Sequence, residues 1–389
     1  MRKQGDAYGN TIPVPVVYAL PSGRSARIQT VLSSTNSPIG PTRSVRFDVE
    51  LASDYAGAYL DELTMKKASS DRGAFVAARK KEMDGLITQL GNSMAHALYR
   101  DGSGSIGKGD GAWTISGTVI TLSQAADTKF FHIGMLLDFS SVSSGAPGTL
   151  RALAATYNVA VTKIDEDAGT ITCALDANGA TVTDISSYYT SLANTDFIHP
   201  AGDYYGSAGQ KIKGLSAWIP LTAPGATSFW GVDRTPHVTR LAGHRLNDST
   251  APCEDSILVL AERMHERGAK PDAAFISPRQ FTKAVKRLNA KVEYDGAGGT
   301  ATYGFSNFKV ETSAGPVAIY ADADCPEDRG YLLNMDTWVV RHLGMPELVT
   351  TDGLSMLRRS GLDEVEIRAR YYAQLVCENP GENGVFAVA

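Results

Sequence analysis

The chain has few cysteines and no long apolar run. Four cysteines occur among its 389 residues, and none forms a CxxC pair or lies beside clustered histidines. A disulfide framework and a structural zinc site are therefore poorly supported. No stretch approaches the ~18 apolar residues of a membrane span, and the first residues lack the apolar core of a signal peptide. We expect a soluble protein without a membrane segment, made in a reducing cytoplasm.

An excess of basic residues is also missing. Lys and Arg number 37 against 42 Asp and Glu, which gives a net charge of -5. Nucleic-acid binding usually depends on basic side chains that displace counterions from phosphates, so a dedicated nucleic-acid-binding protein is disfavoured. Hydrophobic residues make up 43% of the chain. At roughly 150 residues per domain, this length predicts two or three domains with their own cores.

Catalytic signatures are absent as well. The best match is the glycine run from Gly102 to Gly109, which satisfies GxGxxG. Phosphate-binding loops of this kind require a strand before the glycines and a helix after them, whereas here a predicted helix precedes and strands follow. We interpret the run as a flexible joint, with a nucleotide-binding enzyme as the less favoured alternative. No HExxH motif, GxSxG elbow or EF-hand loop is present, so we predict no enzyme activity, no cofactor and no metal site.

The N-terminal part has the pattern of an extended arm. Residues 1 to 44 are polar and carry five prolines, so they cannot bury a core and need another part of an assembly to hold them. Residues 45 to 51 alternate as a half-buried strand with Arg46, Asp48 and Glu50 on the polar side. A second extended stretch from Tyr59 to Lys67 is expected to return beside this strand as a hairpin.

Periodicity then predicts the remaining elements. Apolar residues at steps of three or four from 72 to 100 indicate one long amphipathic helix. Residues 112 to 200 contain short strand-like pieces and few charges, which indicates an inserted β domain, either a barrel or a sandwich. Helices are expected at 252 to 267 and after Ser277, a hairpin around 313 to 315, and a long strand at 365 to 377.

The order and spacing of several stretches resemble one family of self-assembling proteins. The stretches are SSDRGAFVAARKKEMDGLITQLGNSMAHALYRDGSGSIG, KGLSAWIPLTAP leading into FWGVDRTPHVTRLAG, YADADCPEDRGYLLNMDTW, and RARYYAQLVCENPGENGVFAV. Together they resemble the major capsid protein of tailed bacteriophages, in the fold named for phage Hong Kong 97, with an inserted β domain.

The resemblance implies an α+β fold made of an N-terminal arm, an extended loop, a spine helix, and peripheral and axial domains, together with an inserted small β-barrel-like domain. The implied boundaries are 1–44 for the arm, 45–70 for the extended hairpin loop, 71–109 for the spine helix and glycine joint, 110–205 for the inserted domain, 206–229 for a peripheral connection, 230–345 for the axial domain, and 346–389 for the return to the peripheral domain with its long strand.

The resemblance also implies a function. Copies of the chain would form pentamers and hexamers that tile an icosahedral head shell around double-stranded DNA, without sequence-specific binding. Expected partners are a separate scaffolding protein, a portal and a decoration protein, with assembly in the host bacterial cytoplasm, location in the virion, and no N-terminal processing. The candidate assembly contacts are Arg46, Asp48, Glu50, Lys66, Lys67, Arg368 and Arg370.

Two alternatives of a related kind stay open. One is the shell of a cellular nanocompartment, which would enclose a cargo protein in place of a genome. The other is a tail or surface-layer polymer, which would form tubes or sheets.

Overall fold

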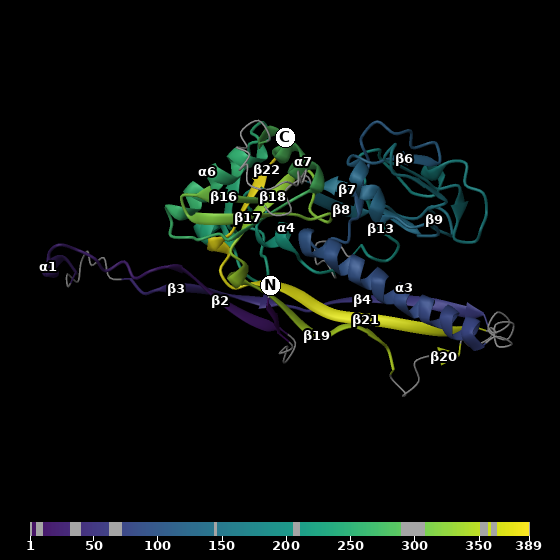
Figure 1. Ribbon diagram of the computed structural model, residues 1–389, viewed down its shortest axis with the longest axis horizontal. Coiled ribbons are helices and arrows are strands. Elements are labelled where there is room, and N and C mark those ends of the chain that lie inside the picture. Colours follow the sequence, from purple (N-terminus) through teal and green to yellow (C-terminus); the bar gives the residue numbers. More distant parts are fainter. Residues whose placement is uncertain are drawn as a thin grey trace, which may run out of the picture. The chain divides into compact units, whose positions relative to one another are not determined.

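The computed structural model describes residues 2–4, 11–31, 40–61, 72–143, 146–204, 211–288, 308–350, 357–358 and 364–388. The chain divides into two compact units, each assembled from segments far apart in the sequence (Figure 1). The first unit comprises Met1–Leu51, Trp218–Met345 and Tyr371–Ala389, and the second comprises Ala52–Ala217 and Pro346–Arg370. No helix in the described ranges is long and apolar enough to cross a membrane.

A six-stranded mixed sheet forms the centre of the first unit. Helix α6 (Cys253–His265) packs on it through a buried apolar face that includes Ile257, Leu260 and Met264. The helices and the hairpin predicted for this region are confirmed. In order across the sheet the strands are β14 (His244–Leu246), β22 (Gly384–Ala387), β18 (Arg329–Leu333), β15 (Ala273–Ile276), β17 (Gly315–Ala321) and β16 (Phe308–Thr312), and the helices are α4 (Leu215–Trp218), α5 (Val238–Ala242), α6 (Cys253–His265) and α7 (Pro278–Leu288).

A separate two-stranded sheet in the first unit corrects the predicted hairpin. Strand β3 (Arg43–Val49) pairs antiparallel with the preceding strand β2 (Ile12–Ala19), with Val14 opposite Phe47. Strand β4 (Ala52–Asp61) pairs with β21 (Glu364–Cys377) instead, so the expected pairing of 45–51 with 59–67 is wrong over its described part. The reason is that β2 supplies apolar residues in register with the buried side of β3. Part of the predicted coreless arm therefore has a partner within the chain.

One long helix dominates the second unit. Helix α3 (Arg72–Tyr99) has 28 residues and lies along β4, with Leu86 and Leu90 buried (Figure 1). The predicted helix is confirmed, and so is the long C-terminal strand β21 (Glu364–Cys377), which runs from the second unit into the first. Its sheet has the order β1 (Arg2–Gln4), β19 (Trp338–Leu348), β21 and β20 (Leu357–Arg358), with β4 also beside β21.

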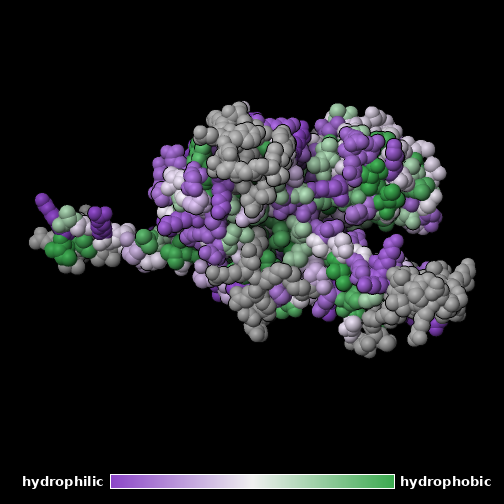
Figure 2. All heavy atoms as spheres, viewed as in Figure 1, coloured by the Kyte–Doolittle hydropathy of each residue, from purple (hydrophilic) through white to green (hydrophobic). Residues whose placement is uncertain are grey.

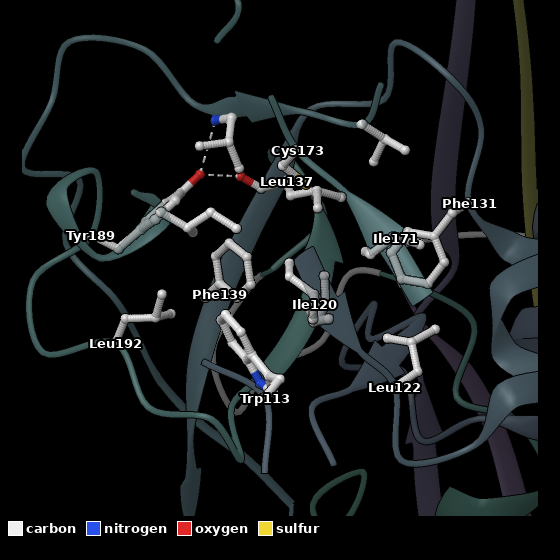
Figure 3. Packing of buried hydrophobic residues seen from close by; sticks show 14 of the residues in the cluster. Trp113, Ile120, Leu122, Phe131, Leu137, Phe139, Ile171, Cys173, Tyr189 and Leu192 are labelled. Carbon is white, nitrogen blue, oxygen red and sulfur yellow. Dashed lines mark hydrogen bonds between the residues drawn. The ribbon is translucent and has the colours of Figure 1, made fainter. Parts of the chain in front are cut away.

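Residues 106 to 200 form a small β region with its own core, in which Trp113, Ile120, Phe139 and Tyr189 converge (Figure 3). The hydroxyl of Tyr189 donates to the carbonyl of Leu137 at 2.5 Å. The strands lie in three small sheets around this core. The first is β5 (Gly107–Lys108), β13 (Phe197–Pro200), β7 (Leu137–Ser143) and β8 (Ala146–Leu150), the second is β10 (Lys163–Asp165), β11 (Thr170–Thr172) and β6 (Val119–Thr121), and the third is β12 (Leu175–Asp176) and β9 (Val159–Ala160).

The two ends of this β region lie next to each other. The N–H of Ile106 donates to the carbonyl of Ile198 at 2.9 Å, and β5 and β13 pair antiparallel. The chain therefore enters and leaves the region on neighbouring strands of one sheet.

Candidate functional site: assembly surfaces

The glycine run after α3 is closely packed. Gly104 has φ +78°, and a Cβ on it would lie 2.5 Å from the carbonyl oxygen of Asp203. Gly102 has φ +89°, and a Cβ there would lie 2.8 Å from the Lys213 side chain. Strand β5 lies within the run and strand β6 is the next element after it, so no helix begins at the run as a phosphate site requires. The glycines permit close backbone approach, and their interpretation as a flexible joint stays a prediction.

A buried polar cluster lies beside the glycines. The Lys211 ammonium is 2.7 Å from Oδ1 of Asp54 and 3.0 Å from Oδ2 of Asp203, and the Ser93 hydroxyl donates to Asp54 at 2.6 Å. Although burial disfavours the ammonium, the two carboxylates hold the pKa of Lys211 above its ordinary value. The cluster thereby joins β4, α3 and the end of the inserted β region.

The cavity at this cluster is small. It has a volume of about 30 Å³, and His96 and Arg100 are among its lining residues. A space of this size holds about one water molecule and is far too small for a nucleotide. Among the described residues, no group of three or more histidine, cysteine or carboxylate side chains is arranged to hold a metal ion.

The candidate contact residues on β3 lie on its exposed side. Nε of Arg46 is 2.8 Å from Oδ1 of Asp48, and the Asp48 N–H donates to the Trp230 carbonyl at 3.1 Å. Glu50 is exposed directly after the strand. These three residues therefore form one charged strip in the first unit.

The candidates on β21 belong to the second unit. Nε of Arg368 is 2.6 Å from Glu366, which raises the pKa of this guanidinium, and Nε of Arg370 is 3.6 Å from Glu347. The described candidate contacts are thus divided between the two units. Lys66 and Lys67 lie outside the described residues.

Aromatic side chains lie on the same sheet. Tyr55 and Tyr59 on β4 are 63% and 53% exposed, whereas Ala52 and Asp54 on the opposite side of the strand are buried. Tyrosine and arginine are enriched at protein interfaces. Together with Arg368 on the neighbouring strand, these tyrosines form a candidate contact face that the sequence analysis did not identify.

The connection between β2 and β3 is a second surface that the sequence analysis missed. Every residue from 20 to 28 is exposed, including Leu20 at 72% and Ile28 at 68%. Helix α1 (Ile28–Val31) stands apart from the central sheet of its unit in Figure 1, and Figure 2 shows apolar residues beside strongly hydrophilic ones there. Counting charged residues segment by segment would identify this surface from the sequence, because residues 11 to 47 contain four arginines and no acidic residue.

Comparison with known proteins identifies the fold. No protein-family model and no curated protein matches the chain. A chain of the cyanophage A-1(L) capsid asymmetric unit is similar over 99% of this chain and 89% of its own length, with 11% identity and a TM-score of 0.53. Capsid chains of the empty and native GTA particles align with TM-scores of 0.44 and 0.43, at 9% and 10% identity, over 100% and 98% of this chain and 88% and 86% of theirs. The likeness to the cyanophage chain confirms the predicted α+β phage capsid fold.

Proposed function

We propose that this chain is the major capsid protein of a tailed bacteriophage, forming the pentamers and hexamers of an icosahedral head shell. The observation that carries the proposal is the similarity to the cyanophage capsid chain over nearly the whole of both chains. A match of that extent includes the exposed hairpin and the inserted region as well as the central sheet. It therefore supports a shared way of assembling.

The exposed surfaces support this role. Head-to-tail contacts between two different patches of identical subunits generate closed rings. The hairpin with its exposed Leu20 and Ile28 and the face with Tyr55 and Tyr59 are two such patches. We assign the extended-loop role to residues 12–49, because β2 and β3 form the observed hairpin. The spine role for 71–109, the axial role for 230–345 and the peripheral roles for 206–229 and 346–389 remain part of the proposal.

The composition is consistent with a container for DNA. A chain of net charge -5 has no overall excess of basic residues for tight binding, and a shell confines a genome by closing around it. The proposed partners are other copies of the chain, a separate scaffolding protein, a portal and a decoration protein. The proposed location is the virion head, after assembly in the host bacterial cytoplasm, and the proposed role is structural.

Electron microscopy tests the function directly. The full chain is produced alone and together with a scaffolding protein, and the purified material is examined by negative stain. We expect closed polyhedral particles of uniform diameter. A monodisperse monomer at high concentration in both preparations would contradict the proposal, and tubes or flat sheets would favour the tail or surface-layer alternative. Closed particles that enclose a cargo protein and no DNA would favour the nanocompartment alternative.

A further inference from the structure

Charge is segregated along the chain in a way that the net value hides. Residues 11 to 47 carry four arginines and no acidic residue, whereas residues 110 to 205 carry ten acidic and three basic residues. The first range covers the β2–β3 hairpin except its last two residues, Asp48 and Val49, and the second covers most of the inserted β region. Within an acidic chain, the hairpin thus carries four arginines against one acidic residue, Asp48, and the inserted region is strongly acidic.

The hairpin combines its positive charge with exposed apolar side chains. Arg24 and Arg27 lie between Leu20 and Ile28, and all four are exposed. Arg43 continues the basic surface on β3 and is exposed too. Burying these apolar side chains together with the arginines requires a surface that offers both apolar area and carboxylates.

The inserted region carries exposed groups of both kinds. Most of its described carboxylates are used internally: Asp196 binds Arg151 at 2.7 Å, and Asp176 accepts backbone N–H groups of its own turn. Glu166 and Asp167 are exposed at the turn between β10 and β11. Apolar side chains are exposed in the same region, of which Ile133 is the most exposed at 74%.

We propose that the hairpin of one copy docks on the inserted β region of a second copy, with Arg24 and Arg27 facing Glu166 and Asp167. This inference rests on the proposed shell function and adds to it the partner surface and the chemistry of the contact. Opposite charges on two elements of identical chains favour a head-to-tail contact, because two hairpins, or two inserted regions, repel each other.

A nucleic acid fits the hairpin less well. Phosphates would pair with the arginines, but a phosphate backbone offers no apolar surface to cover Leu20 and Ile28. The carboxylates of a second copy pair with guanidinium groups equally well, and exposed residues such as Ile133 supply the apolar part. The hairpin therefore suits a protein partner.

A charge exchange in the full chain tests the docking. The double variant Arg24→Glu with Arg27→Glu should lower the yield of particles at least tenfold, and so should Glu166→Arg with Asp167→Arg. Combining all four substitutions makes the hairpin positions acidic and the turn positions of the inserted region basic, so the two sites again have opposite charges. This variant should recover at least half of the wild-type yield. As a control for the arginine reversal, Lys270→Glu with Lys309→Glu makes the same change of charge at exposed positions outside both elements, and should leave the yield unchanged.

The outcomes separate this inference from the proposed function. If the wild-type chain forms no particles, the shell function fails. If it forms particles and the two reversals assemble normally, or the combined variant is not rescued, the docking is overturned while the function stands. If the arginine variant assembles normally and loses co-purifying nucleic acid, the hairpin binds nucleic acid instead. Subunit melting temperatures should agree within about 2 °C, because all four side chains are exposed.

Discussion

Buried histidines make the stability of the chain sensitive to pH. Burial lowers the pKa of His96, of His199 to about 4, and of His244 to about 4. His199 has its Nε2 2.8 Å from the Ser140 hydroxyl, inside the inserted region. A histidine that is held neutral in the folded state takes up protons more readily after unfolding.

The sign of the effect follows from these pKa values. Between pH ~6.5 and pH ~4 the unfolded chain binds more protons at His199 than the folded chain does, so stability is present above this window and lost as the pH falls through it. We expect the loss from His199 to be about 3 kcal/mol. When the pH is lowered from 7.5 to 4.5, the melting temperature should fall less steeply for His199→Gln than for wild type. His132→Gln, at an exposed site, should keep the wild-type slope. An unchanged slope in His199→Gln would refute this account.

Gly104 is the second residue with a specific requirement. Gly104→Ala adds a Cβ 2.5 Å from the Asp203 carbonyl oxygen at φ +78°, so the free energy of unfolding should fall by about 2–4 kcal/mol. Gly179 has φ +80° with open space around its Cβ position. Gly179→Ala should therefore cost only about 1 kcal/mol, the backbone cost alone. Chemical denaturation followed by circular dichroism measures both, and equal losses would show that the close approach is unimportant.

At the scale of elements, the periodicity of apolar residues predicts individual helices and strands. Helix α3 and strand β21 show their periods of 3.6 and 2 over many residues, because each buries one continuous face. The pairing of β2 with β3 is less accessible from sequence: Pro13 and Pro15 make β2 resemble an irregular arm, and the strands are separated by a connection of 23 residues, Leu20 to Thr42. Which strand completes an apolar face is decided by tertiary packing.

The prolines of β2 protect an edge. The Asp48 N–H points away from β2 toward Trp230, so its opposite residue Pro13 also directs its nitrogen outward, and Pro15 does the same two residues later. Proline has no N–H for another strand to bind. Replacing both by valine should raise light scattering of the purified subunit severalfold, through pairing of free edges. Pro21→Val, in the exposed connection, should not, and equal scattering would argue against edge protection.

For the candidate contact residues too, the sequence predicts some properties and not others. Arg46 and Arg368 were identified from alternation, which correctly places them on the outer side of their strands, but each pairs with an acidic residue two positions away on its own strand. Local patterns predict exposure, whereas partners depend on the fold. The basic hairpin was missed because a net charge of -5 averages over opposite elements.

At the scale of the whole molecule, the inserted region has the properties of an independent folding unit. It has its own core, and its ends are joined by the pairing of β5 with β13. A fragment of residues 105–204 should therefore unfold cooperatively and give dispersed amide resonances. Ile120→Ala in this fragment, at a fully buried position, should cost about 2–5 kcal/mol, whereas Val119→Ala, at an exposed one, should cost under about 1 kcal/mol. A fragment that unfolds without cooperativity would contradict this view.

The neighbouring ends of that region also bear on how such a gene changes. A recombination event can replace the segment between Ile106 and Ile198 with another segment. The new segment must only begin and end on two neighbouring, paired strands, as β5 and β13 do here. The rest of the chain then closes around the junction as before. A lineage can exchange this part for another, or lose it, while keeping the remainder of the coding sequence, so this segment is where the greatest divergence among descendants of the gene is expected.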